Sequence, residues 1–514
     1  MSKPFCVARD PWITVRVRAD LDEAERAELG LLLPGASVGG RAEVGLGGLL
    51  HCAHLLADLE VAEPPVETVL RRFLAALVLR VGGLDVRDGN GWLDAREDLL
   101  GAGRFDAGRV DAYFARQPQR WWLYGGPRPF LQDPRLVEES PGMGFAGRLA
   151  MDRPSGDNPV WAERVAQEEA VPAARSVGWL LAWHGLGPSG TVTYRTRNGR
   201  KSRMSNAGPY RALISFFPRH PGSLFVSLML SVPHPAAWPN GPGADHAPWE
   251  SEELADPAVP AVPSGPVSLL TARTAHAVLL EGDAVSGTTG CRVTWGTSVP
   301  LPAAVDPYTA EQDPGGPLRA ERARAMWRDL DALLLHERST RTRSRKTTVR
   351  RPAVFDSLAE LPSNLVDALG VRAVAWDQEG KDRSKAWYTA TTPPVLRYLT
   401  ERDADRAAAV SEANTRAAQT AEALGTALEA AWTGAYPKRR TDLRYGIVEQ
   451  GQTWFWERAE AEFWRTVRDP GTPPGFRHIA LECFDTATAS LKTSPRARHA
   501  VARARAILLR RAAR

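Results

Sequence analysis

The chain has 514 residues, 43% of them hydrophobic and 24% charged, so it is long enough for several domains with a sizeable core. Its 65 Lys and Arg against 60 Asp and Glu give a formal net charge of +5, which is compatible with a nucleic-acid partner without establishing one. Four scattered cysteines argue against a disulfide framework and a zinc site. With no signal-peptide core and no transmembrane run, we expect a cytoplasmic protein.

Short strands and helices alternate in the first part of the chain. The hydrophobic pattern predicts, in order, a strand at 5–17, two helices within 45–81 divided at Pro64-Pro65, a short helix at 175–184, a buried strand and a second apolar segment within 210–232, and a strand at 268–281 with a hairpin-like segment after it. This mixture of elements is typical of an α+β protein.

A glycine-rich segment, GLGPSG at 185–190, has the spacing of a dinucleotide-binding motif. That motif requires a strand before it and a helix after it, whereas here a helix precedes and a strand follows, so we reject this interpretation. The segment instead offers exposed backbone to a partner. Five basic residues follow with no acid among them, and a solvated charge run is the alternative to a binding surface: Arg195, Arg197, Arg200, Lys201 and Arg203.

A second basic segment lies at 338–351, after a predicted amphipathic helix at 317–337. No acidic residue interrupts the basic segment, and counterion release favours phosphate binding by such a run. A flexible charged loop is the alternative.

Residues 369–394 predict a β-hairpin. Two β-rich segments, Val371–Trp376 and Lys385–Thr391, flank a polar tip at Asp377–Arg383, and Pro393-Pro394 ends the second strand. We expect the tip to be exposed because it is too polar for burial and too long for a tight turn. A hairpin of this kind suits insertion into a partner, although an ordinary solvated loop gives the same pattern.

The last part of the chain is rich in Ala, Arg and Glu and predicts four helices, at about 396–433, 443–468, 476–491 and 495–513. Short connections imply antiparallel neighbours and hence a four-helix bundle. The sequence therefore predicts two domains, a mixed α/β N-terminal domain at 1–395 and an all-α C-terminal domain at 396–514.

Catalytic motifs give a negative result. We find no P-loop, GxSxG, HExxH or metal-binding cysteine spacing. A stand-alone metal-dependent nuclease with dispersed carboxylates would escape this search and stays open as an alternative function. A scaffold that contacts only other proteins is a further alternative.

Taken together in their order along the chain, nine short segments resemble the CasA family, the large subunit of the type I-E CRISPR Cascade complex. They are ARDPWITVR, RPFLQ, GDNPVW, SNAGPYRALISFF, SLFVSLML, PWE, WRDLDALL, RPAVFDSLAEL and LGVRAVAWDQEGKDRSKAW. The resemblance implies a family-specific α/β topology, no catalysis and no cofactor. It also implies partners: crRNA, double-stranded target DNA, the backbone, guide-end and small Cascade subunits, and a helicase–nuclease effector. The protein would read the protospacer-adjacent motif (PAM) from the minor groove and wedge the duplex open, while guide pairing reads the sequence.

The same resemblance assigns site residues. It identifies Gln378 as the residue that stacks under the first base pair, with Glu379 and Lys381 beside it. The glycine loop is assigned to Gly187, Ser189 and Gly190, and docking of the guide end to Asn158 and Trp161. Charge alone adds six DNA-binding candidates: Arg197, Arg200, Lys201, Arg343, Arg345 and Lys346.

Two positions depart from the family pattern. Glu250 follows Trp249 where some members carry a lysine finger, and the cysteine cluster of some members is reduced to Cys291. We therefore expect neither the PAM contact of that lysine finger nor the zinc of those members.

Overall fold

The computed structural model describes residues 4–151, 169–189, 193–321, 325–341, 346–379, 383–436, 441–469, 471–491 and 494–511. The chain divides into two compact units, Met1–Arg322 with Pro352–Leu396 and Ala323–Arg351 with Arg397–Arg514. The second unit thus includes residues 323–351, a segment that the predicted boundary after residue 395 assigns to the N-terminal domain.

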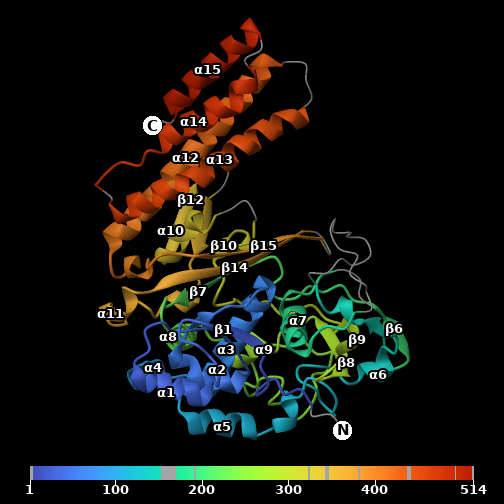
Figure 1. Ribbon diagram of the computed structural model, residues 1–514. Helices are drawn as coiled ribbons and strands as arrows, with labels where there is room; N and C mark the ends of the chain where they lie inside the picture. Colours follow the sequence, from blue (N-terminus) through green and yellow to red (C-terminus); the bar gives the residue numbers. More distant parts are fainter. Residues whose placement is uncertain are drawn as a thin grey trace. The chain divides into compact units, whose positions relative to one another are not determined.

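The first unit mixes helices and strands (Figure 1). Its described helices are α1 (Glu23–Leu32), α2 (Leu46–Cys52), α3 (Pro64–Gly82), α4 (Gly89–Ala102), α5 (Ala107–Ala115), α6 (Leu136–Glu139), α7 (Ala173–Leu186), α8 (Leu224–Leu230), α9 (Pro266–Thr271) and α11 (Ser363–Val366). Its described strands are β1 (Ile13–Val17), β2 (Arg41–Val44), β3 (Leu56–Leu59), β4 (Gly144–Phe145), β5 (Arg195–Arg197), β6 (Arg200–Ser202), β7 (Ile214–Arg219), β8 (His276–Asp283), β9 (Gly287–Trp295), β10 (Glu311–Asp313), β11 (Gly316–Pro317), β14 (Gly370–Glu379) and β15 (Arg383–Thr391).

Helix α3 forms the centre of this unit and packs against α7, α8, α9 and β14. Pro64 and Pro65 occupy its first turn, where a missing N–H costs nothing, and Gly83 ends it in the left-handed conformation. Nearly all of its side chains are buried, including Arg71 and Arg72. A helix that is buried on every side needs its charges paired, and Arg72 donates to Asp306 and to Ser215.

The first unit contains three antiparallel sheets of three strands, in the orders β2-β1-β3, β4-β9-β8 and β15-β14-β7. The last one contains the predicted hairpin, and β14 pairs with β7 through Gly370–Ala375. Strand β15 lies at the edge of this sheet. Two further strand pairs are antiparallel, β5 with β6 and β10 with β11.

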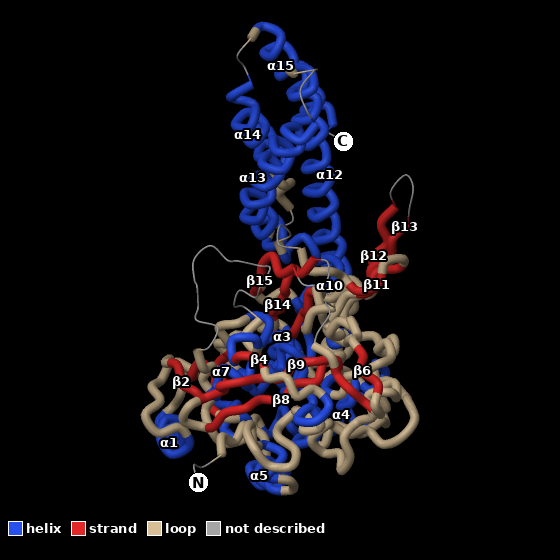
Figure 2. Tube along the Cα trace, turned by 90° about the vertical axis from the view of Figure 1, so that its right-hand side faces the viewer, coloured by secondary structure: helices blue, strands red, loops and turns tan. Residues whose placement is uncertain are grey.

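The second unit is mainly helical, as Figure 2 shows for its long helices. Its described elements are α10 (Leu330–Leu334), β12 (Glu337–Arg341), β13 (Lys346–Arg350), α12 (Ala404–Ala435), α13 (Thr441–Arg468), α14 (Phe476–Thr488) and α15 (Pro495–Arg511). Helix α12 packs against α13, α14 and α15, which confirms the four predicted helices.

The predicted helix at 317–337 is wrong. Its described part contains a strand residue at Pro317, a 3-10 turn at Met326–Asp329, the short helix α10 and the start of β12. The apolar residues that gave the helical pattern are buried by tertiary contacts: the ring of Trp327 lies 4.7 Å from that of Phe463 and 5.6 Å from that of Trp456 on α13. Packing of this kind overrides a weak local preference.

Candidate nucleic-acid interface

The β14–β15 hairpin is present in the predicted place (Figure 1). Its strands pair from Arg372–Thr391 to Glu379–Arg383, with a bulge between Asp377 and Gln378. Trp376 and Trp387 face each other across the strands with ring centroids 6.2 Å apart. Bulky side chains that pair across the strands stabilise the register in which the two strands are paired.

The structure corrects the prediction of an exposed tip beginning at Asp377. Asp377 and Gln378 are strand residues and are only 8% and 5% exposed. Gln378 tolerates burial because its Oε1 accepts the backbone N–H of Ala212 at 3.2 Å. Ala212 has a φ of 59°, and its carbonyl accepts from Ala320, so Gln378 satisfies the donor of a residue held in a sparsely populated conformation.

Of the other two residues assigned to the tip, Glu379 is exposed at the end of β14. Lys381 lies outside the described residues. The exposed aromatic side chain on this hairpin is Trp387, 37% exposed on the edge strand. Behind it the ring of the buried Trp179 lies 6.4 Å away, so the indole rests on a rigid base.

The glycine segment is used differently from the prediction. Gly187 is buried, and a Cβ added there would lie 2.5 Å from the imidazole ring of His276. His276 Nε2 bonds to the carbonyl oxygen of Pro188 at 3.0 Å, and burial lowers the His276 pKa to about 4. The small size of Gly187 therefore serves contact with the protein interior. Ser189 is half-buried, and Gly190 lies outside the described residues.

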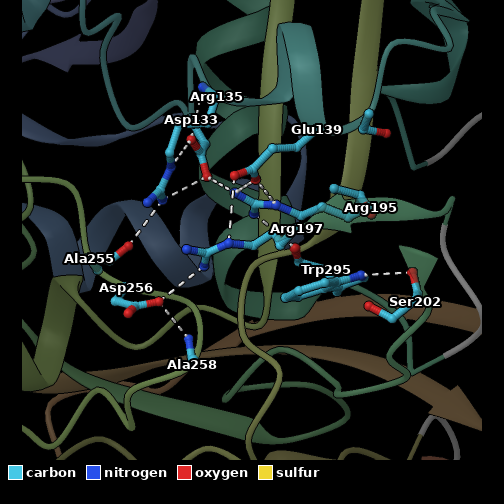
Figure 3. A network of polar contacts seen from close by, with 12 residues as sticks. Asp133, Arg135, Glu139, Arg195, Arg197, Ser202, Ala255, Asp256, Ala258 and Trp295 are labelled. Atoms are coloured by element: carbon cyan, nitrogen blue, oxygen red, sulfur yellow. Dashed lines mark hydrogen bonds and ion pairs between the residues drawn. The ribbon is translucent and has the colours of Figure 1, made fainter. Parts of the chain in front are cut away.

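The β5–β6 hairpin that follows has an inner and an outer face, because side chains alternate along a strand. Arg195 lies on the inner face, fully buried, and pairs with Asp133 at 2.7 Å and Glu139 at 2.5 Å. Arg197 lies on the same face and pairs with Asp256 at 3.0 Å (Figure 3).

This inner network is anchored to neighbouring segments. Arg135 pairs with Asp133 at 2.8 Å and donates to the carbonyl of Ala255 at 3.0 Å. Burial alone would raise the pKa of Asp133, but its hydrogen bond from Arg135 and the charge of Arg195 hold that pKa below its ordinary value. The predicted DNA-binding residue Arg197 is therefore largely neutralised within the protein, and the network fixes the hairpin to the body of the unit.

The outer face carries the accessible charge. Lys201 Nζ lies 4.5 Å and Arg203 Cζ 3.8 Å from the ring centroid of Tyr194, which is 42% exposed. Arg200 is exposed at the turn. Within the described part of the chain, none of these three cations forms an ion pair. An exposed ring beside unpaired cations is the arrangement that stacks a base and holds its phosphate.

The second basic segment forms the β12–β13 hairpin in the second unit. Two of its arginines are already paired, Arg338 with the buried Asp331 at 2.9 Å and Arg351 with Glu401 at 2.7 Å. Lys346 begins β13. Arg343 and Arg345 lie outside the described residues, as do Asn158 and Trp161 of the predicted guide-end loop.

Trp249 and Glu250 make their contacts within the protein. Trp249 is buried, with its ring 4.7 Å from that of Phe73, and its Nε1 donates to Tyr113 Oη at 2.8 Å. Glu250 pairs with Arg80 at 3.1 Å.

The two hairpins that the first unit contributes to the candidate interface do not lie together. Figures 1 and 2 both show β6 apart from β14 and β15 within the first unit. Across the described ranges no three His, Cys, Asp or Glu side chains gather as a metal site, and no helix is long and apolar enough to cross a bilayer.

Sequence reasoning missed Trp387 and Tyr194. Both are aromatic residues of segments with a β-like pattern. Side chains alternate between the two faces of a strand, but the sequence does not say which face packs against the rest of the protein and which faces solvent.

The α/β unit with its hairpin and the helical second unit are the architecture of a CRISPR-associated protein. The chain belongs to the family described as CRISPR-associated protein Cse1, whose sequence model matches residues 33–490. It is 30% identical over 306 residues to CRISPR-associated protein CasA/Cse1 of Thermus thermophilus. That alignment covers 58% of this chain and 57% of the relative, little more than half the length of each.

Solved structures match over the full length. A chain of a CRISPR RNA-guided surveillance complex is 33% identical with a TM-score of 0.83, and the match covers 99% of this chain and 100% of that one. The crystal structure of Thermus thermophilus CasA gives a TM-score of 0.74 at 20% identity, covering 99% and 100%, and Thermobifida fusca Cse1 gives 0.75 at 18%, covering 99% and 98%. The last two establish likeness of fold.

Proposed function

We propose that this protein is the non-catalytic large subunit of a crRNA-guided DNA surveillance complex in antiviral defence. It binds the guide end of the complex, recognises the PAM in double-stranded DNA through the minor groove, opens the duplex beside it and helps to recruit the helicase–nuclease. The observation that carries the proposal is the full-length match, at 33% identity, to a chain of an RNA-guided surveillance complex.

The hairpin surface supports a role in opening DNA. Glu379 and Trp387 are exposed on a hairpin whose base is fixed in a three-stranded sheet. Stacking on an aromatic ring contributes about 1–3 kcal/mol per base, which offsets part of the few kcal/mol that unstacking a base step costs. Lys381 remains a proposed DNA contact. Gln378, being bonded to Ala212, contributes by holding the strand.

The β5–β6 surface supports a role in tracking the nucleic-acid backbone. The residues that we propose for it are Arg200, Lys201 and Arg203 with the ring of Tyr194. Ser189, Gly190 and the basic residues Arg343, Arg345 and Lys346 remain proposed DNA contacts, and Asn158 and Trp161 proposed guide-end contacts.

The test is duplex opening by the assembled complex. We would co-express the chain with the other Cascade subunits and a crRNA, and place 2-aminopurine beside the PAM of a target duplex. Wild type should give a fluorescence increase on opening. Lys201→Ala/Arg203→Ala should lower the slope of log affinity against log salt by about two, because two phosphate contacts are lost.

The matched control is Arg104→Ala/Arg116→Ala, which removes two exposed positive charges elsewhere in the first unit. Its salt slope should stay at the wild-type value. A complex that assembles without this chain entering it, or that opens no duplex, would refute the proposal. Plasmid cleavage by the chain alone with Mg²⁺ would favour the metal-dependent nuclease instead.

A further inference from the structure

A polar cavity of about 600 Å³ lies in the first unit between the β2-β1-β3 sheet and the base of the β14–β15 hairpin. Four arginines line it, Arg16, Arg41, Arg219 and Arg372, with the carboxylates of Asp58 and Glu60. Of the hairpin described above, Arg372 and Thr391 at its base belong to the lining of this cavity.

The ion pairs around this cavity leave a surplus of positive charge. Each carboxylate is shared by two arginines: Glu60 by Arg16 and Arg41, Asp58 by Arg219 and Arg71, and Glu67 by Arg71 and Arg372. Burial alone would raise the pKa of all three carboxyl groups, yet the arginines beside them hold each pKa below its ordinary value. Five guanidinium groups thus face three ionised carboxylates, an excess of two positive charges.

Hydrogen-bond donors are also left over. Arg219 uses Nε to bind Asp58 Oδ2 at 2.6 Å, and Arg41 uses Nε to bind Glu60. In the described part of the chain neither arginine finds an acceptor for its two terminal nitrogens. The side chain of Arg41 is 71% exposed and that of Arg219 only 22%. The guanidinium of Arg41 therefore lies at the mouth of the cavity and that of Arg219 against its wall.

We propose that this cavity is a phosphate-binding site. Guanidinium forks match the oxygens of a phosphate in a bidentate geometry, and the excess of two charges suits a dianion or two neighbouring phosphodiesters rather than a single carboxylate. The Thr14 and Thr391 hydroxyls in the wall add further polar partners.

The site has a direct connection to the hairpin. Arg372 and Thr391 are paired across β14 and β15 at the base of the hairpin, and Arg372 Nη1 donates to Thr391 Oγ1 at 3.2 Å. A phosphate bound to Arg372 therefore contacts the strands that carry Trp387. The inference goes beyond the proposed function and does not depend on it.

The experiment is isothermal titration calorimetry of the full chain, without crRNA or other subunits. The titrants are pyrophosphate, inorganic phosphate, a twelve-nucleotide single-stranded DNA and polyglutamate at matched ionic strength. We expect pyrophosphate to bind the wild-type chain, and to bind Arg41→Ala/Arg219→Ala at least tenfold more weakly. Arg41→Ala, which alters only an exposed side chain, should bind it severalfold more weakly than wild type does. Arg104→Ala/Arg116→Ala is the control with an equal change of charge and should bind as wild type does.

The DNA arm identifies the source of the phosphate. Binding of the oligonucleotide that pyrophosphate displaces, and that the same variants weaken, assigns the site to a nucleic-acid backbone. Binding of pyrophosphate without the oligonucleotide assigns it to a free phosphorylated ligand. No heat with pyrophosphate, equal affinity in wild type and Arg41→Ala/Arg219→Ala, or equally tight binding of polyglutamate overturns the proposal. Any of these results leaves duplex opening by the assembled complex untouched.

Discussion

Replacing Arg195 by Met tests whether the buried network holds the β5–β6 hairpin in place. Methionine fills most of the volume but leaves Asp133 and Glu139 without the guanidinium that contacts both at 2.7 and 2.5 Å. Removing one partner of a buried ion pair costs about 3–5 kcal/mol because the remaining charge stays desolvated. Arg135 still neutralises Asp133, so we expect the lower end of that range.

The matched control is Arg197→Met on the same strand and face. Its side chain is 24% exposed and its partner Asp256 is 54% exposed, so the loss should be about 1 kcal/mol or less. Urea unfolding is monitored by hydrogen exchange in peptides around 133–145 and 193–203. The exchange in these peptides measures the unfolding of this region separately from that of the helical unit. Equal destabilisation by the two substitutions would refute the argument from burial.

The pH dependence gives a second readout of the same network. The pKa of Asp133 lies below its ordinary value in the folded protein, so its stabilising contribution is present above about pH 4 and is lost as pH falls through the folded pKa. The stability difference between wild type and Arg195→Met should therefore narrow in acid.

Three further predictions concern Gln378, Trp387 and Asp331. Gln378→Leu should destabilise the first unit by about 1–3 kcal/mol and speed amide exchange at Ala212, whose donor loses its acceptor; an unchanged exchange rate argues against this. Trp387→Ala should slow 2-aminopurine-detected opening in the assembled complex while Trp387→Phe retains most of it, and equal rates for Ala and wild type contradict base stacking there. Burial raises the pKa of Asp331 to about 6, so its contribution to the free energy of unfolding should fall as pH rises from about 4 to 7. Asp331→Asn should abolish this contribution, which is roughly 3 kcal/mol, in urea titrations at a series of pH values. Parallel pH profiles of the unfolding free energy for the two proteins would disprove it.

Local pattern was enough to predict much of the fold. The four long helices, the buried α3 and the β14–β15 hairpin follow from spacing, proline positions and β-branched or aromatic runs, because each depends on residues close together in the chain. The prediction of a helix at 317–337 was wrong because Trp327 packs against the ring of Phe463 on α13, a contact that the local pattern does not contain.

Sequence by itself determined the long helices and the β14–β15 hairpin, and where positive charge and family resemblance concentrate. Only the tertiary structure decided which of those polar side chains face solvent. Gln378 is buried because it accepts the backbone N–H of Ala212, which lies 166 residues earlier in the chain. Arg197 is neutralised by the carboxylate of Asp256. The cavity between β1, β3 and the hairpin base likewise unites arginines from four separate strands. The free energy of a polar group depends on partners that folding brings from far along the chain, and no local pattern records them.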